Sequence, residues 1–286
     1  MEKRVNFTFY GGFCTMAKER GLDCAAAWAQ GKGFRSVEFY EEAAGAQKSL
    51  IGSLAEARAV KERLAEYGLT TACYSLLGCL YGEGADENEA FLMKQAEFAA
   101  ELGSPFLHHT LLWWLQLPPN APTYEEAFEE VLDRATRVAK RCEGLGITCL
   151  YEEQGLYFNG VNGFGRFFKE MKKRQPNVGV CGDMGNILFV DETPDLFFEA
   201  FKKDIKHVHL KDYFLKTPPQ PSCDGVWYPT AGGNLLCDCK LGEGVVPFEK
   251  CISALKSAGY DGAYSFELSR LDHFDDGIAF AQKVLG

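Results

Sequence analysis

The fold is decided by four short segments in the second half of the chain: ITCLYEE (residues 147–153), VGVCGD (178–183), IKHVHLKD (205–212) and AYSFE (263–267). Each is a β-rich apolar run that ends at a side chain able to bind a metal ion, and a helix-like stretch separates each run from the next. The four side chains are Glu152, Asp183, His209 and Glu267. If the runs are parallel strands of a closed barrel, these side chains converge at its mouth. Three carboxylates and one imidazole there predict a divalent-metal site.

The same alternation of strand and helix extends over the whole chain. Strands are predicted at Val5–Tyr10, Phe34–Phe39, Leu69–Ser75, Pro105–Thr110, Ile147–Glu152, Val178–Asp183, Ile205–Leu210 and Gly262–Glu267. Helices are predicted over residues 16–31, 53–67, 87–102, 123–144, 161–174, 194–203, 248–257 and 275–284. Eight such units, without a Gly-x-Gly-x-x-Gly motif after the first strand, favour a single (β/α)8 TIM barrel over a doubly wound nucleotide-binding fold. We therefore expect one α/β domain over residues 1–286.

One connection is much longer than the others. It runs from about residue 212 to 244, is rich in Pro, Gly and Cys, and leaves its strand shortly after His209. Loops of this length in a compact domain are usually functional or disordered. We expect a lid over the barrel mouth; a disordered insert and an oligomer contact are the alternatives.

Composition excludes several classes of partner and compartment. The net charge is −10, without a basic stripe, which disfavours a nucleic-acid partner. No signal-peptide pattern or membrane-length apolar run is present. The eleven cysteines follow no disulfide framework, and Cys237-Asp-Cys239 lacks a second pair at zinc-finger spacing. Free thiols in a reducing compartment explain them best, so we expect a cytoplasmic protein.

The motifs that carry the predicted ligands resemble a known superfamily. GITCLYEEQG (146–155), VGVCGDMGN (178–186), HVHLKD (207–212) and GYDGAYSFE (259–267) are similar to motifs of sugar isomerases and epimerases with a xylose isomerase-like barrel. The resemblance implies one divalent ion (Mn²⁺, Mg²⁺, Co²⁺ or Zn²⁺) held by Glu152, Asp183, His209 and Glu267. Members include ketose 3-epimerases, hydroxypyruvate isomerase, inosose dehydratase and dehydroshikimate dehydratase. Asn186 stands where many of the epimerases and the related DNA-repair nucleases carry a histidine, which weakens a ketose 3-epimerase assignment and disfavours a nuclease.

The same residues predict a reaction class. A keto sugar or related polyol could chelate the ion, which would polarise the carbonyl and stabilise an enediolate. Glu152 and Glu267, on opposite sides of the substrate, would be the catalytic base and acid. Such proton transfer can epimerise or isomerise a substrate, or, with loss of a hydroxyl group, dehydrate it. We expect an isomerase or epimerase of carbohydrate metabolism, with a dehydratase as the alternative and a non-catalytic sugar-binding barrel as a distant third.

Six further residues are candidates for contact with the substrate near the metal ion: Lys211, Asn186, His207, His109, Trp113 and Glu38. The alternatives are that His207 supports a metal ligand or fills the core, that Lys211 is solvated, and that Trp113 is a core or interface aromatic. Of the adjacent His108 and His109, only one can face the barrel interior, because successive strand residues point to opposite faces. We expect His109 to be the inward residue. Exposed apolar loops also suggest self-association into a homo-oligomer.

Overall fold

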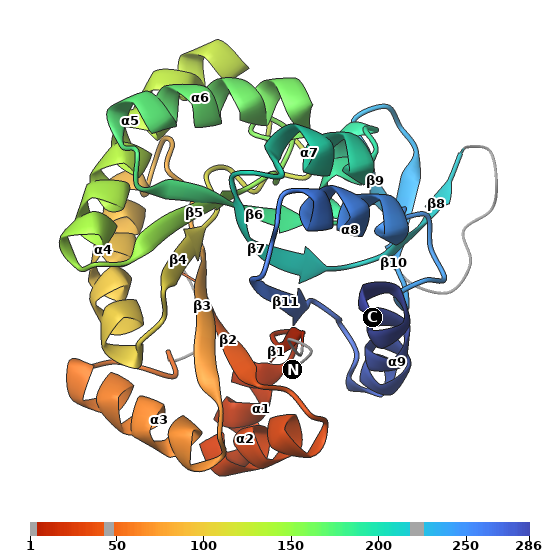
Figure 1. Cartoon of the computed structure of the whole chain (residues 1–286). Coiled ribbons are helices and arrows are strands. Elements are labelled where there is room, and N and C mark those ends of the chain that lie inside the picture. Colours follow the sequence, from red (N-terminus) through yellow and green to blue (C-terminus); the bar gives the residue numbers. More distant parts are fainter. Residues whose placement is uncertain (1–4, 43–48, 218–225) are drawn as a thin grey trace.

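A computed structural model describes residues 5–42, 49–217 and 226–286 as an eight-stranded, closed, parallel β-barrel (Figure 1). The strand order around the barrel is β1-β11-β7-β6-β5-β4-β3-β2. The barrel strands are β1 (Asn6–Phe9), β2 (Ser36–Glu42), β3 (Thr70–Leu77), β4 (Phe106–His109), β5 (Thr148–Glu152), β6 (Val178–Asp183), β7 (Ile205–Leu210) and β11 (Ala263–Phe266). The predicted TIM barrel is confirmed, and all eight predicted strands are present within a few residues of their expected bounds.

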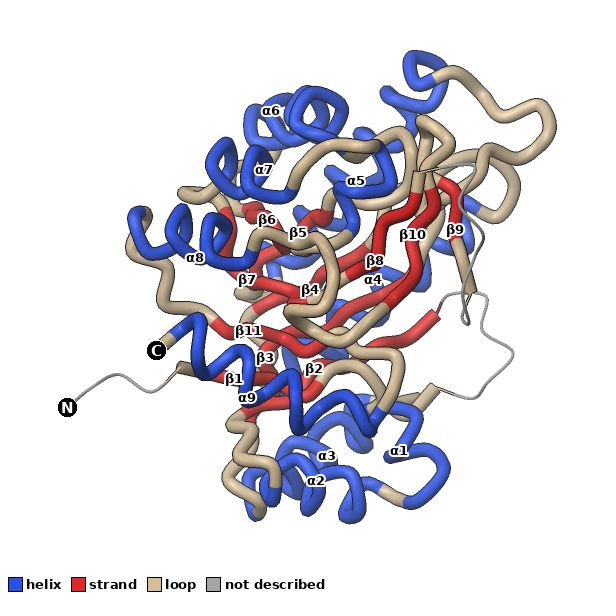
Figure 2. Tube along the Cα trace, turned by 90° about the vertical axis from the view of Figure 1, so that its right-hand side faces the viewer, coloured by secondary structure: helices blue, strands red, loops and turns tan. Residues whose placement is uncertain are grey.

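The helices lie around the outside of the barrel and bury their apolar faces against it (Figures 1 and 2). They are α1 (Phe13–Arg20), α2 (Leu22–Gly31), α3 (Leu54–Glu66), α4 (Ala85–Leu102), α5 (Tyr124–Gly144), α6 (Gly165–Arg174), α7 (Pro194–Phe201), α8 (Phe248–Ser257) and α9 (Phe274–Leu285). Short turns of other helical types are η1 (Gly160–Phe164), η2 (Asn186–Val190) and η3 (Leu271–His273). Within the described residues, no helix is both long and apolar enough to cross a membrane.

Helix α5 shows how local sequence fixes an element. The Thr123 side chain accepts a hydrogen bond from the backbone N–H of Glu126, and the Glu126 carboxylate accepts one from the backbone N–H of Thr123. This reciprocal capping begins the helix where the sequence predicts it. By contrast, the single helix expected over residues 16–31 is two helices. Gly21, with φ of 90°, separates α1 from α2 because a residue in that conformation cannot continue a right-handed helix.

The long connection after β7 contains regular structure rather than a simple loop. β8 (Tyr213–Lys216), β10 (Leu235–Asp238) and β9 (Tyr228–Pro229) form an antiparallel sheet in that order (Figure 2). Asp212 holds the start and the end of this connection together. The buried carboxylate of Asp212 accepts hydrogen bonds from the backbone N–H groups of Gly242, Gly244 and Val246. Residues 218–225 of the predicted lid lie outside the described residues.

The barrel interior is built in layers. Cys73, Leu150 and Cys181 form a small apolar cluster inside it, against which Phe106 packs. Residues two positions further along each strand point into the next layer towards the mouth. In β5, β6 and β4 these residues are Glu152, Asp183 and His108. On these three strands, the layering therefore places polar side chains directly above a small apolar cluster.

Candidate metal centre

The four predicted metal ligands come together at the C-terminal ends of their strands. Glu152 and Asp183 are the last residues of β5 and β6, His209 lies near the end of β7, and Glu267 directly follows β11. One potential ligand atom from each of the four lies within 4.8 Å of the others. Catalytic residues of TIM barrels occupy this end of the barrel.

His209 is the centre of the cluster. Its Nδ1 atom lies 2.9 Å from Oε1 of Glu152, 3.1 Å from Oε2 of Glu267 and 3.7 Å from Oδ2 of Asp183. The ring of Tyr10 stacks on the imidazole, with ring centroids 4.8 Å apart. One nitrogen facing three carboxylates is the donor set that a divalent ion would bind.

Asp183 provides an independent test of whether a cation fits. Its Oδ1 atom accepts hydrogen bonds from the backbone N–H groups of Gly185 and Asn186, both at 2.7 Å. Its Oδ2 atom is buried and has no hydrogen-bond partner among the described residues. Burial raises the pKa of this carboxyl group. An unpartnered carboxylate oxygen is costly to bury, so this atom fits a direct metal ligand.

Glu152 and Glu267 have different electrostatic environments. Burial raises the pKa of the Glu152 carboxyl to about 7. Burial would also raise the pKa of Glu267, but Lys211 and His209 together outweigh it and lower the pKa to about 2. Lys211 forms an ion pair with Oε1 of Glu267 and lies 3.7 Å from Oδ2 of Asp183. Without metal, the Glu152 carboxyl is thus near its titration point at neutral pH, whereas the Glu267 carboxyl is ionised.

A buried carboxylate beneath the cluster organises the histidines. Oε1 of Glu38 accepts hydrogen bonds from the hydroxyl of Ser75 and from Nε2 of His209, the latter at 3.0 Å. Oε2 accepts from the hydroxyl of Ser265 and from Nε2 of His207, the latter at 2.7 Å. Burial would raise the pKa of Glu38, but His207 and His209 hold it well below its usual value. A metal-ligating histidine commonly has such a partner on its other nitrogen.

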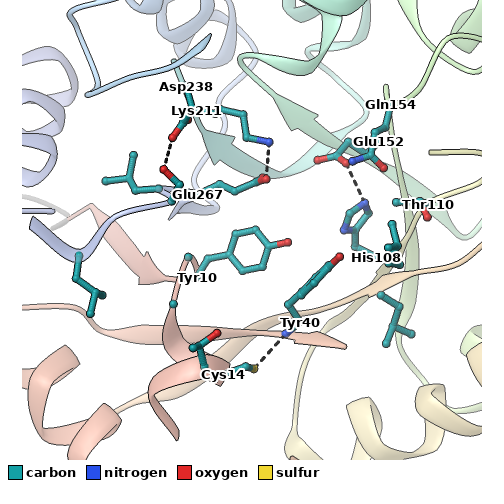
Figure 3. A pocket seen from close by; sticks show the side chains of 18 of the residues that line it. Tyr10, Cys14, Tyr40, His108, Thr110, Glu152, Gln154, Lys211, Asp238 and Glu267 are labelled. Carbon is teal, nitrogen blue, oxygen red and sulfur yellow. Dashed lines mark hydrogen bonds and ion pairs between the residues drawn. The ribbon is translucent and has the colours of Figure 1, made fainter. Parts of the chain in front are cut away.

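A cavity of about 650 Å³ opens above the cluster (Figure 3). Its polar lining includes the carboxylates of Glu152 and Glu267, Lys211, Gln154 and His108. Its aromatic lining consists of Tyr10, Tyr40, Phe189, Tyr213 and Tyr228. The antiparallel sheet after β7 contributes Tyr213, Tyr228 and Asp238, so the long connection forms one wall of this cavity. Mostly apolar walls with a few polar groups are typical of small-molecule sites.

Of the six predicted substrate contacts, Lys211 reaches the cavity, and five lie outside its described lining. Glu38 and His207 are fully buried one layer below, because β2 continues to Glu42 and leaves Glu38 in the strand interior. Asn186 is buried too, with its Oδ1 atom 3.4 Å from Nζ of Lys211. Trp113 is 44% exposed and lies outside the lining. Contact of these five residues with a substrate stays a prediction.

The prediction that His109 faces the barrel interior was wrong. His109 points outwards, where Nδ1 bonds to the carbonyl of Thr110 and the ring packs edge-on against Tyr151. His108 faces inwards and lines the cavity. The strand reads Phe-Leu-His-His, so apolar alternation gives no information on which histidine is inside. Gln154 and Tyr10 were missed because neither lies in one of the four ligand positions.

The sequence profile of the Xylose isomerase-like TIM barrel matches residues 18–284. Inosose dehydratase 2 of Bacillus cereus is 23% identical over 191 residues, which span 64% of this chain and 63% of that enzyme, less than two thirds of its length.

Solved structures show the same fold at low identity. A xylose isomerase domain protein from Planctomyces limnophilus superposes with a TM-score of 0.74 at 14% identity, covering 99% of this chain and 98% of that one. D-Psicose 3-epimerase with D-tagatose from Clostridium cellulolyticum H10 gives 0.71 at 14%, covering 98% and 99%. A xylose isomerase-like barrel from Mycobacterium smegmatis in complex with magnesium gives 0.67 at 16%, covering 92% and 87%. With the family profile matching nearly its whole length, the chain belongs to the xylose isomerase-like TIM barrel family.

Proposed function

We propose that the protein is a divalent-metal-dependent isomerase or epimerase that moves a proton at a carbon beside the carbonyl group of a keto sugar or related polyol. The observation that carries this proposal is the convergence of Glu152, Asp183, His209 and Glu267, from separate barrel strands, within 4.8 Å at the floor of a cavity. The magnesium-bound and epimerase neighbours support the same class.

The four side chains would hold one ion, either Mn²⁺, Mg²⁺, Co²⁺ or Zn²⁺. Such an ion acts as a Lewis acid and as a template that orients substrate oxygens. The buried, unpartnered Oδ2 atom of Asp183 and the Nδ1 atom of His209 supply fixed donors for it. Glu38, bonded to the other nitrogen of His209, keeps that ring in position.

Glu152 and Glu267 would carry the proton transfer. As a metal-bound carboxylate, Glu152 would keep a free oxygen that could take and return the proton. Glu267 is kept ionised by Lys211, whose ammonium group also lines the cavity and would donate a hydrogen bond to a substrate oxygen.

A dehydratase is the second candidate, favoured by the likeness to inosose dehydratase 2. The same abstraction of a proton beside a carbonyl, followed by departure of a β-hydroxyl group, gives loss of water. A barrel that binds sugar without turning it over is the remaining alternative.

One experiment separates these candidates. The metal-loaded protein is incubated in D₂O with D-fructose, D-tagatose and 2-keto-myo-inositol, and the products are examined by mass spectrometry and NMR. Isomerisation or epimerisation conserves the substrate skeleton and adds deuterium at carbon, whereas dehydration gives a product lighter by one water. Glu152→Gln and Glu267→Gln should each abolish deuterium uptake. Full uptake in either variant removes that residue from the mechanism.

Other features of the protein fit this proposal. The ten cysteines in the described residues are free thiols, and Cys223 lies outside them, which supports a reducing, cytoplasmic location. We infer a single barrel domain in which the sheet of β8, β9 and β10 covers the mouth. Phe214, Leu215 and Val226 on this connection are exposed and support self-association.

A further inference from the structure

His108 lines the cavity but plays no part in the proposed metal site. It lies on the inner face of β4 and is only 3% exposed. Its Nδ1 atom bonds to the hydroxyl of Ser75 at 2.9 Å. Its Nε2 atom is buried, has no hydrogen-bond partner among the described residues, and lies 3.6 Å from Oε2 of Glu152 (Figure 3).

The bonds around Ser75 determine which nitrogen of His108 carries the proton. The single proton of the Ser75 hydroxyl is donated to Glu38, because an ionised carboxylate can only accept. The Ser75 oxygen must then accept a hydrogen bond from His108, which places a proton on Nδ1. At 3.6 Å from Oε2 of Glu152, Nε2 makes no hydrogen bond, whereas an N–H there would be expected to donate one to that carboxylate. A neutral imidazole has one N–H, so Nε2 presents a lone pair.

Nε2 of His108 is therefore a buried acceptor at the cavity wall, 3.6 Å from Oε2 of Glu152. It has no donor among the described residues, and an unsatisfied buried acceptor is costly. A substrate hydroxyl group bound beside Glu152 would donate its single proton to Nε2.

We propose that His108 is a substrate-binding residue, whose Nε2 atom accepts a hydrogen bond from a substrate hydroxyl group beside Glu152, and that Glu38 fixes this acceptor state through Ser75. The inference rests on the proposed function for the nature of the substrate. The recognised group would be the substrate hydroxyl on the side of the reacting carbon that faces Glu152. An analogue lacking this hydroxyl leaves Nε2 of His108 unpaired.

The acceptor state can be measured without a substrate. The chain has five histidines, so ¹⁵N-histidine NMR can assign each ring by single substitutions. In Mg²⁺-loaded protein without added sugar, His108 should show a protonated Nδ1 and a bare Nε2. Ser75→Ala should mix the two tautomers. Ser265→Ala is the matched control, because Ser265 donates to the other oxygen of Glu38 and makes no bond to His108. A protonated Nε2 in the wild type overturns the proposal.

Binding is then tested with whichever of D-fructose, D-tagatose or 2-keto-myo-inositol is turned over. His108→Leu should raise KM by about 2- to 12-fold, the range for one lost neutral hydrogen bond, with a smaller change in kcat. His108→Gln, which keeps an acceptor, should recover part of the loss. Equal KM values for wild type and His108→Leu, with both proteins folded, contradict the proposal. If none of the three sugars is turned over, the proposed function fails, while the NMR result still decides the acceptor state.

Discussion

Oε1 of Glu38 accepts a hydrogen bond from Nε2 of His209 at 3.0 Å, although the two residues lie 171 positions apart in the chain. This bond leaves the Nδ1 atom of His209 directed at the carboxylates of Glu152, Asp183 and Glu267. Glu38 itself is fully buried and lies outside the lining of the cavity. The orientation of the imidazole at the proposed metal site is thus set from below by a residue of the second strand.

Glu38→Gln should weaken metal binding by about 10- to 100-fold, the usual effect of losing the partner of a ligating histidine. The amide NH₂ cannot accept a hydrogen bond, so at least one of the four donors to Glu38 loses its partner. Isothermal titration with Mn²⁺ measures the effect. Glu41→Gln is a control on the same strand that is also buried but bonds to Leu50 and Lys18 instead. Equal affinities in the two variants would show that Glu38 does not orient His209.

Asp183→Asn should lower metal affinity by more than about 100-fold, since it removes a direct ligand and its charge, whereas loss of an indirect partner costs less. The amide oxygen can still accept from the backbone N–H groups of Gly185 and Asn186, so the loop should keep its shape. Asp195→Asn, on the surface helix α7, serves as the control. Metal content after dialysis, measured by mass spectrometry, should fall in the first variant alone. Retention of one ion per chain by Asp183→Asn contradicts this assignment.

Metal binding should weaken as the pH falls below about 7. In the metal-free protein, burial raises the pKa of Glu152 to about 7, so a proton competes with the ion for this carboxylate. The same raised pKa means that ionising Glu152 costs stability in the metal-free fold as the pH rises from about 4.5 towards 7. Glu152→Gln should therefore flatten the stability profile of the metal-free protein in that range. Thermal melting at pH 5 and pH 8 in EDTA checks this, and an unchanged profile in Glu152→Gln refutes it.

Glu89 stabilises the packing of α4 on α5 far from the cavity. Its carboxylate bonds to Arg137 at 2.5 and 2.7 Å and to Arg134 at 2.9 Å. The hydrogen bond from Arg137 is the largest of the effects that lower the pKa of Glu89, so its contribution is present above about pH 4.5 and is lost as the pH falls. Glu89→Gln should cost about 1.5–3 kcal/mol at pH 7, the range for hydrogen bonds to charged groups.

Glu97→Gln is the matched control for Glu89→Gln. Glu97 lies on the same helix and pairs with Arg141, but both partners of this pair are well exposed. Its loss should cost at most about 1 kcal/mol. Urea denaturation at pH 7 and pH 3 compares the variants. The difference between Glu89→Gln and wild type should shrink at pH 3; a constant difference would show that the charge of Glu89 is not responsible.

The barrel and the convergence of the four predicted ligands were predictable from sequence because strand-like runs alternate regularly with helical stretches and each run ends at a polar side chain. Each of the runs ending at Glu152, Asp183, His209 and Glu267 is apolar and short, and parallel strands bring their C-terminal ends to one face. That face is common to all the strands of a TIM barrel, so no long-range contact had to be known. The capping box at Thr123 was equally local.

The surroundings of the ligand set could not be predicted in the same way. β2 continues through Glu41 and Glu42, polar residues that are typical of a strand end, and this places Glu38 below the mouth rather than at it. In β4, two adjacent histidines follow two apolar residues, so side-chain parity is ambiguous. The sheet after β7 is built from strands of two and four residues, too short for a clear alternation. In each case, the local sequence is compatible with more than one arrangement, and contacts with the rest of the barrel determine which one forms.

The most direct test of the account is anomalous X-ray scattering from crystals grown with Mn²⁺. The account predicts one strong peak bounded by Oδ2 of Asp183, Nδ1 of His209 and carboxylate oxygens of Glu152 and Glu267, with Glu38 still bonded to Nε2 of His209. Absence of a peak at this position at saturating Mn²⁺, or a peak bound by other side chains, would contradict it.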